Sequence, residues 1–190
     1  MQEISSSKQE SSAQSISELI RLQASGNPPL LVVLSGPSHA GKSTFARRLG
    51  ENFTTISSDE IRRQLNVSFE DRKHEARVWK LFESMKYKAL KEGRDIILDA
   101  CHMSPQARWH ALQGPNSCYR KICIVFDLAL QTLRQRCLKT RRVSLCEVGR
   151  MWMDFQQNRP FKDELKRLDF DKVYFVRQCD EYETVFSDLI

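Results

Sequence analysis

The sequence predicts an α/β fold, in which a parallel sheet of about five strands carries helices on both faces. Two observations predict it. Apolar stretches of strand length alternate along the chain with segments of helical periodicity. The first apolar stretch, Leu30 to Leu34, has no polar break, as expected of a strand that is buried on both faces of a sheet.

The composition is that of one ordinary globular domain. Of 190 residues, 41% are hydrophobic and 28% are charged. No apolar run approaches the length of a membrane span, and the first residues lack the core of a signal peptide, so we expect a cytoplasmic protein with no membrane partner. Six cysteines are scattered without a CxxC pair, which favours buried thiols over disulfides or a zinc site.

Three parts are expected along the chain. Residues 1–14 are rich in Ser, Gln and Glu, which predicts a disordered leader. Residues 15–29 are expected to form a short helix and a linker, because apolar residues at helical spacing are followed by Gly26-Asn27-Pro28-Pro29. Residues 30–190 are then the folded domain.

A glycine-rich loop connects the first strand to a helix. It reads Gly36-x-x-x-x-Gly41-Lys42-Ser43, and the apolar residues after it recur at helical spacing. Such a loop turns successive backbone N–H groups toward one point, with the dipole of the following helix behind them, and so cradles phosphate oxygens. The sequence therefore predicts a P-loop that binds a nucleoside triphosphate, either ATP or GTP.

Individual P-loop residues have separate expected roles. Lys42 should reach the β- and γ-phosphates, and the Ser43 hydroxyl should bind Mg²⁺. His39 takes an inner position where glycine is frequent, and we expect its side chain to point outward rather than to act in catalysis. The loop residues predicted to bind nucleotide are Gly36, Pro37, Ser38, His39, Ala40, Gly41, Lys42, Ser43 and Thr44.

The next elements follow from caps, breakers and periodicity. A short strand is expected around Phe53 to Ile56, and Ser57-Ser58-Asp59 then opens a helix. A longer helix covers roughly residues 70–91, since apolar residues share one face and Gly93 ends it. The later elements are a strand at 96–98, a helix from Ser104-Pro105, a strand at 122–126, a basic helix from about 130, a helix at about 145–155 and a last strand at 173–176.

Asp99 directly follows an apolar strand. In P-loop proteins an acid at this position typically holds Mg²⁺ or its water shell, so Asp99 joins Ser43 as a predicted metal ligand. The alternative is that Asp99 caps the helix that begins near Ser104, because Asp is a favoured cap residue.

Asp59 and Arg62 lie three positions apart at the start of one helix, so both side chains can face one pocket. The preceding strand ends at the same sheet edge as the P-loop, where ligands bind. A carboxylate there can accept the proton of an attacking hydroxyl, and a guanidinium can hold a phosphate with paired donors. Helix capping by Asp59 or Ser58, with Arg62 in solvent, fits the spacing equally well.

The segment from Leu130 to Arg142 carries five cations and no acid. It follows the fourth strand, where a mobile lid commonly covers the triphosphate, so residues of about 130–160 are expected to form a lid and Arg136 to bind nucleotide. A lid arginine would neutralise charge on the transferring phosphoryl group. The alternative is a solvated helix face, and spacing alone does not identify the arginine.

Several motifs occur in a familiar order and spacing. They are Gly36 to Thr44, Ser58-Asp59-Glu60-Ile61-Arg62, Ile96-Ile97-Leu98-Asp99-Ala100, Pro105-x-x-Arg108, Arg136 to Arg142 and Phe155-x-x-x-x-Pro160-x-x-x-Glu164. In these the chain resembles, over roughly residues 30–176, the P-loop kinase superfamily that includes the phage 5′-polynucleotide kinase domain and its relatives. The P-loop is common to many enzymes, whereas the blocks Asp59-x-x-Arg62 and Asp99 to Arg108 are more specific.

The resemblance assigns further roles. It implies that Asp59 is the general base, that Arg62 and Arg108 bind the acceptor, with Arg62 orienting its phosphate, and that Arg141 or a neighbour is the catalytic lid arginine. Relatives often read Asp-Ala-Thr-Asn at the strand end, where this chain has Asp99-Ala100-Cys101-His102. We therefore expect an acceptor pocket that differs from theirs.

Together these features predict a Mg²⁺-dependent kinase that moves the γ-phosphoryl group of a nucleoside triphosphate onto a hydroxyl, with a DNA or RNA 5′-OH as the first candidate acceptor. The second candidate is a small-molecule hydroxyl on a nucleoside, sugar nucleotide or antibiotic. A third hypothesis is a nucleotide-dependent regulatory module that is not a kinase, because P-loops also serve switches.

Overall fold

The computed structural model describes residues 28–68, 71, 73–114, 117–140, 143–160 and 167–177. The predicted leader at 1–14 lies outside the described residues, as does the predicted helix after it. Arg141, the residue predicted to be the catalytic lid arginine, also lies outside them. In the described part of the chain, no helix is long and apolar enough to cross a bilayer.

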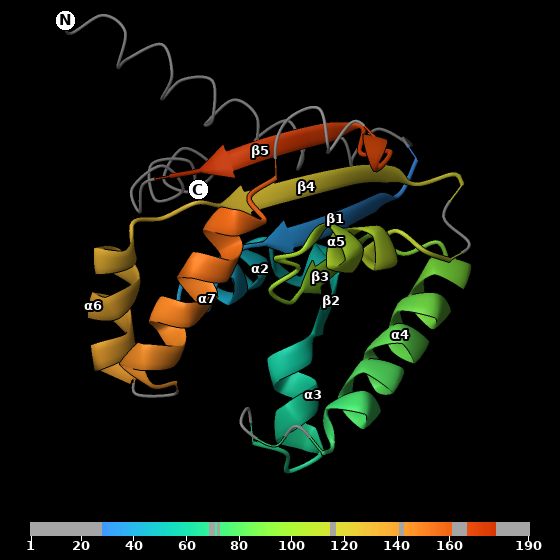
Figure 1. Cartoon of the computed structure of the whole chain (residues 1–190). Helices are drawn as coiled ribbons and strands as arrows, with labels where there is room; N and C mark the ends of the chain where they lie inside the picture. The colour runs from blue at the N-terminus through green and yellow to red at the C-terminus, as the bar shows by residue number, and fades with distance from the viewer. Residues whose placement is uncertain are drawn as a thin grey trace, which may run out of the picture.

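The fold is a five-stranded parallel sheet in the order β2-β3-β1-β4-β5, which confirms the predicted α/β class (Figure 1). The strands are β1 (Leu30–Ser35), β2 (Thr54–Ser57), β3 (Ile96–Asp99), β4 (Arg120–Phe126) and β5 (Lys172–Val176). The helices are α2 (Lys42–Arg48), the 3₁₀ turn η1 (Gly50–Asn52), α3 (Ser58–Gln64), α4 (Glu75–Lys91), α5 (Pro105–Ala111), α6 (Leu130–Thr140) and α7 (Leu145–Gln157).

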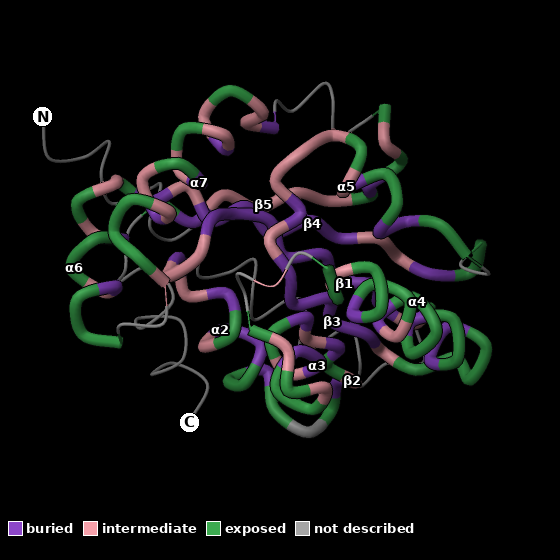
Figure 2. The backbone as a smooth tube through the Cα atoms, turned by 60° about the horizontal axis from the view of Figure 1, so that its bottom comes forward, coloured by how far each residue is buried: buried purple, intermediate pink, exposed green. Residues whose placement is uncertain are grey.

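β1 is the central strand, and all its residues are buried (Figure 2). Leu30, Val32 and Leu34 face one hydrophobic core, whereas Leu31 and Val33 face the other. Because both faces of the strand are covered, both sets of alternate residues must be apolar. This explains why the first strand reads as a continuous hydrophobic run.

Helices cover both faces of the sheet. The first core is closed by α2 and α6, and the second by α3, α4 and α5. α7 contributes Val148 to the first core and Phe155 to the second. α7 therefore crosses from one layer to the other near the carboxyl ends of the strands, where the ligand sites of parallel sheets lie.

The predicted elements from residue 30 to residue 176 are present, with shifted ends. α4 begins at Glu75, later than the predicted start near 70. Ser104 caps α5 as expected, because its Oγ accepts a hydrogen bond from the Ala107 N–H at 3.1 Å. Trp152 packs against the first core, and its indole N–H donates to the Leu128 carbonyl at 3.1 Å.

The cysteines only partly match the expectation of buried thiols. Cys123 and Cys137 are buried, whereas Cys118 and Cys146 are exposed. Cys118 lies in the turn before β4, and Cys146 lies in the first turn of α7.

Candidate functional site

The P-loop runs from the end of β1 to the start of α2. The Gly36 N–H donates to the Cys101 carbonyl at 2.8 Å, which fixes the loop to the segment after β3. A Cβ on Gly36 would lie 2.7 Å from the Phe126 carbonyl oxygen, and its φ of 147° is one that other residues rarely adopt. The first glycine of the motif is therefore required by its close approach to β4.

Lys42, the first residue of α2, is buried within the loop. Its Nζ donates to the carbonyl oxygens of Gly36 at 2.9 Å and Pro37 at 2.7 Å. These bonds hold the ammonium at the loop, where the oxygens of a bound triphosphate are natural replacement partners.

A cavity of about 450 Å³, called here the P-loop cavity, lies against this loop. Its walls come from the P-loop and α2, from α6, and from the carboxyl ends of β2 and β3. Of the charged side chains that line it among the described residues, four are cations and two are carboxylates. They are Lys42, Arg47, Arg136 and Lys139, and Asp59 and Asp99.

Asp99 and Ser43 both line the P-loop cavity. Asp99 is buried, and its Oδ2 accepts a hydrogen bond from the Ser57 hydroxyl at 3.1 Å. Since Ser104 itself caps α5, the alternative role of Asp99 as a helix cap is not supported. No cluster of three or more His, Cys, Asp or Glu residues suited to a metal ion occurs within the described ranges. A carboxylate and a hydroxyl are nonetheless suitable for Mg²⁺, which commonly completes its shell with water and phosphate oxygens.

α6 contacts the P-loop directly. Arg136 Nη1 donates to the His39 carbonyl at 3.1 Å, and the Thr140 hydroxyl lies 3.3 Å from His39 Nδ1. The His39 ring therefore lies against α6, and the expected outward orientation is wrong. These contacts bring the predicted nucleotide-binding Arg136 to the P-loop.

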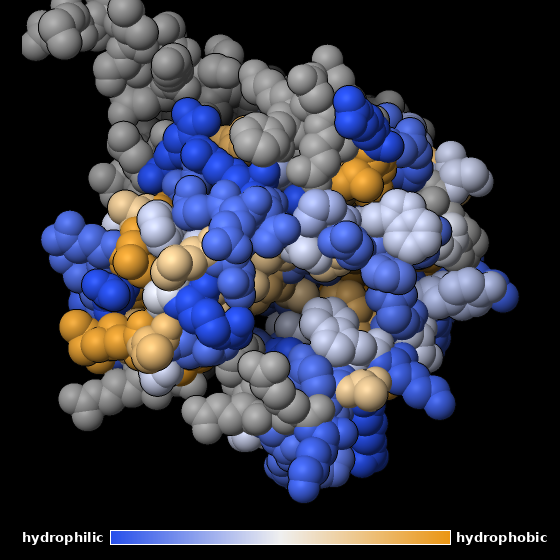
Figure 3. Space-filling view, in the orientation of Figure 1, coloured by the Kyte–Doolittle hydropathy of each residue, from blue (hydrophilic) through white to orange (hydrophobic). Residues whose placement is uncertain are grey.

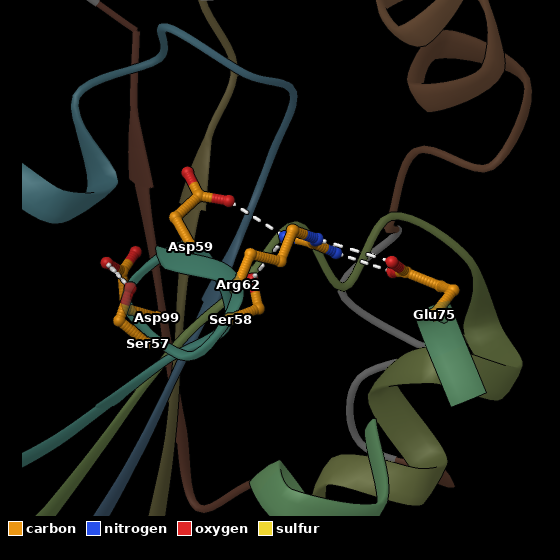
Figure 4. A network of polar contacts seen from close by, with 6 residues as sticks. All are labelled: Ser57, Ser58, Asp59, Arg62, Glu75 and Asp99. Carbon is orange, nitrogen blue, oxygen red and sulfur yellow. Dashed lines mark hydrogen bonds and ion pairs between the residues drawn. The ribbon is translucent and has the colours of Figure 1, made fainter. Parts of the chain in front are cut away.

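Arg62 joins two carboxylates at the start of α3 (Figure 4). Its Nη1 donates to Asp59 Oδ1 at 2.8 Å, and its Nη2 and Nε bind the Glu75 carboxylate at 2.5 and 3.3 Å. Burial alone would lower the pKa of Arg62, but Glu75 and Asp59 together raise it above its ordinary value. Glu75, on α4, could not be found from the sequence, because no short-range spacing connects it to Arg62.

The capping alternative for Asp59 is not supported either. The N-cap of α3 is Ser57, and no side-chain hydrogen bond caps this helix. The Arg62 side chain is only 9% exposed, so it is not a solvated surface group, whereas the Asp59 side chain is 66% exposed. Asp59 is thus held by Arg62 on one side and open on the other.

A second cavity of about 640 Å³, called here the α7 cavity, lies between α7, α3, α4 and the β3–α5 segment. Figure 3 shows this face hollowed between the α7 and α4 sides, with apolar atoms in the hollow and hydrophilic atoms around it. Ser58, Asp59 and Cys101 line both cavities. Asp59 therefore stands at the boundary between the two spaces.

Arg108 does not line either cavity. It is fully buried, and its guanidinium donates to the carbonyl oxygens of His102 at 3.2 Å, Met103 at 2.5 Å and Asn158 at 3.0 Å. These bonds join the β3–α5 segment to the end of α7. The position gives Arg108 a structural role in the wall of the α7 cavity, and does not support the predicted contact with an acceptor.

His102 is a cavity residue to which the sequence assigned no role. It lines the α7 cavity, and its Nδ1 lies 2.8 Å from the Leu34 carbonyl oxygen, so Nδ1 carries a proton and donates it. Burial is the largest of the causes that lower the pKa of His102 to about 4, with the charges of Lys42, Lys86 and Arg108 adding to it. The only signal in the sequence was the departure from the Asn of relatives at this position.

A family model described as an AAA domain matches residues 31–149, well over half of the chain. The chain belongs to the AAA domain family. The matched part of this AAA domain includes the P-loop, Asp59, Arg62, Asp99 and α6. No curated protein matches the chain.

Solved structures with a similar fold include a chain of an RNA repair complex and small-molecule kinases. A chain in the Pnkp1/Rnl/Hen1 RNA repair complex is 25% identical with a TM-score of 0.60, over 70% of this chain and 46% of that one. The protein thus spans less than half the length of that chain. A shikimate kinase from Acinetobacter baumannii is 18% identical, with a TM-score of 0.54 over 88% and 94% of the two chains. A sugar kinase from Janibacter sp. HTCC2649 is 16% identical, with a TM-score of 0.53 over 85% and 92%.

These likenesses confirm the predicted fold and the resemblance to P-loop kinases. The two small-molecule kinases support the fold alone at their low identities.

Proposed function

We propose that this protein is a phosphotransferase that moves the γ-phosphoryl group of a nucleoside triphosphate onto a hydroxyl group. The observation that carries the proposal is the position of Asp59 at the boundary of two cavities. One cavity surrounds a phosphate-binding loop, and the other extends away from it past Arg62. A module that only bound nucleotide would have no use for a second cavity that meets the first at a carboxylate.

The P-loop cavity is the donor site in this proposal. The loop N–H groups, Lys42, Arg136 and Lys139 bind the triphosphate and offset the charge that develops on the γ-phosphoryl group. Residues of about 130–160, which include α6 and α7, act as the lid, and Arg141 supplies a further cation as the resemblance implies. Ser43 and Asp99 would hold Mg²⁺, which would supply positive charge to neutralise the phosphate oxygens.

The α7 cavity is the acceptor site. The acceptor hydroxyl lies beside Asp59, which accepts its proton as the new O–P bond forms and the bond to the β-phosphate oxygen breaks. The ion pair with Arg62 holds the Asp59 carboxylate in place for this transfer. The products are the phosphorylated acceptor and the nucleoside diphosphate.

Two acceptor classes fit this reaction. A polynucleotide 5′-OH is supported by the likeness to a chain of an RNA repair complex and by the resemblance that gives Arg62 an acceptor phosphate. A small-molecule hydroxyl is supported by the α7 cavity, because its volume of about 640 Å³ is typical of small-molecule sites.

The test is transfer from γ-labelled ATP or GTP to a panel of 5′-OH oligonucleotides, nucleosides and sugars. In single-turnover assays Asp59→Asn should lose roughly 10²- to 10⁴-fold in transfer rate, while the dissociation constant of the triphosphate stays unchanged. Glu60→Gln is the matched control, because Glu60 is the next residue of α3 and pairs with Arg63 at the surface. This control should keep the wild-type rate.

Two results would contradict the proposal. Full transfer by Asp59→Asn would remove Asp59 as the base. No labelled acceptor with the wild-type protein, under conditions where the triphosphate binds, would favour the regulatory module instead.

A further inference from the structure

The two cavities that meet at Asp59 differ in charge. The P-loop cavity has more cations than carboxylates along its described lining. The α7 cavity has the reverse, with four carboxylates against two arginines among its described lining residues. They are Asp59, Glu83, Glu147 and Asp154, against Arg62 and Arg150. The first cavity therefore suits phosphate groups, whereas the second is unfavourable to them.

Both arginines of the α7 cavity already bind two carboxylates each. Arg150 donates to Glu147 at 2.5 and 2.9 Å and to Asp154 at 2.9 Å, within one face of α7. Arg62 is held between Asp59 and Glu75. A phosphate that bound either arginine would have to displace a carboxylate and then face it at short range, which is a repulsive arrangement.

The fourth carboxylate of the lining, Glu83, pairs with a lysine that does not line the cavity. Glu83 on α4 pairs with Lys86 at 2.6 Å, and the Lys86 side chain is 2% exposed and is absent from the described lining. Lys86 Nζ also donates to the His110 carbonyl at 2.9 Å. Because Glu83 itself reaches the lining, the cavity meets the carboxylate and not the lysine.

The floor of the α7 cavity adds a neutral hydrogen-bond acceptor. Since Nδ1 of His102 donates to Leu34 and the ring is uncharged near neutral pH, the other ring nitrogen, Nε2, has a free lone pair. Trp79 on α4 also lines the cavity; its ring packs against Phe82 with the centroids 5.3 Å apart, and its exposure of 37% leaves aromatic surface that a cation could contact. The lining thus offers carboxylates, a ring nitrogen and an aromatic face, all of which favour hydrogen-bond donors and positive charge.

We propose that the acceptor bound in the α7 cavity is a small polyhydroxyl compound that carries an amino group, and not a polynucleotide end. The inference rests on the proposed phosphotransferase function. The ammonium lies among Glu83, Glu147, Asp154 and the Trp79 ring, and one hydroxyl donates to His102. Another hydroxyl gives its proton to Asp59 as its oxygen bonds to the γ-phosphorus and the nucleoside diphosphate leaves with the electron pair of the broken bond. The amine is unchanged.

The binding experiment uses the full chain without triphosphate, so that it does not depend on catalysis. Calorimetry compares matched amino, uncharged and phosphorylated compounds built on hexose, cyclitol and nucleoside frameworks, together with a 5′-OH oligonucleotide. At least one amino compound should bind ten times more tightly than its phosphorylated counterpart. Tighter binding of the phosphorylated compounds or the oligonucleotide, or no binding by any amino compound, would overturn the inference.

A pair of variants tests the charge directly. Glu83→Gln should raise the dissociation constant of the amino compound about fivefold, since one nearby charge is removed. The dissociation constant of the uncharged counterpart should stay the same. Glu92→Gln at the C-terminal end of α4, outside the lining of either cavity, is the control and should change neither. Circular dichroism confirms that both variants are folded. An unchanged preference for the amine in Glu83→Gln would contradict the inference.

Transfer assays with the same compounds separate this inference from the proposed function. Labelled phosphate on an amino compound supports both. Labelled phosphate on the oligonucleotide alone contradicts the inference and leaves the phosphotransferase function standing. Binding of an amino compound without transfer to any acceptor supports the charge preference of the cavity and contradicts the phosphotransferase function.

Discussion

The two cavities that share Asp59 are built in different ways. The P-loop cavity is lined partly by one continuous segment, the P-loop from Gly36 to Thr44 with Lys42, and its other walls come from α6 and the ends of β2 and β3. The α7 cavity is assembled from α3, α4, the β3–α5 segment and α7, and its character comes from side chains. In the proposed function, binding of the triphosphate is thus encoded mainly by a local segment, whereas selection of the acceptor is encoded by tertiary packing.

The largest expected effect disrupts the P-loop cavity alone. Lys42→Ala should lower the transfer rate about 10³-fold and weaken triphosphate binding, because it removes the charge nearest the transferring group. Ligand binding in the α7 cavity should not change, as measured by calorimetry without triphosphate. Lys88→Ala, at an exposed position of α4, is the control. A parallel loss of ligand binding in the α7 cavity would show that the two cavities do not act separately.

A smaller effect is expected from a variant that disturbs the close approach of Gly36 to the Phe126 carbonyl on β4. Gly36→Ala should lower the free energy of unfolding by about 3 kcal/mol, because the new Cβ meets the Phe126 carbonyl at 2.7 Å. Gly50→Ala is the matched control, since Gly50 has a φ of 74° but no atom within 4 Å of the added Cβ. It should cost only about 1 kcal/mol. Urea unfolding followed by circular dichroism measures both, and equal losses would mean that contact with β4 is unimportant.

The smallest effect belongs to the side chains of the α7 cavity. The pKa of His102 is lowered to about 4 from an ordinary value of 6.5, so below pH 6.5 the unfolded chain binds a proton that the folded chain does not. This group should therefore remove roughly 2 kcal/mol of stability between pH 7.5 and pH 5. His102→Asn should lack that part of the loss, and Asn suits the positive φ of 36° at this position.

The measurement is the free energy of unfolding of the wild type and of His102→Asn, each at pH 7.5 and at pH 5. The loss of stability between the two pH values is then compared between the two proteins. The same loss in both proteins would show that His102 is not held neutral by burial. A greater loss in the variant would contradict the sign of the effect.

The contrast between the cavities also explains what could be predicted from the sequence. The strands, the P-loop and Asp99 lie in short contiguous sequence patterns, so they can be recognised from residues that are close together along the chain. Asp59 and Arg62 were found because both lie at the start of one helix. In each case the relevant neighbours are within a few positions along the chain.

The remaining parts depend on contacts between distant segments. Glu75 reaches Arg62 from another helix, and Arg108 turns into the wall because carbonyl groups of the β3–α5 segment and of Asn158 surround it. The His39 ring was expected to point outward, and it lies against Thr140, which is 101 positions away. Single-sequence patterns carry no information on which carbonyl or carboxylate a long side chain meets after folding.

The position of Asp59 at the boundary of the two cavities has a consequence for hydrolysis of the triphosphate in the proposed reaction. In the proposed reaction, a carboxylate that receives a proton from an acceptor hydroxyl could equally receive one from a water molecule that enters the α7 cavity. The proposed reaction therefore predicts slow hydrolysis of the triphosphate when no acceptor is bound. An acceptor that fills the roughly 640 Å³ of the α7 cavity would exclude this water, so the proposal predicts that a closely fitting acceptor lowers the fraction of triphosphate that is hydrolysed.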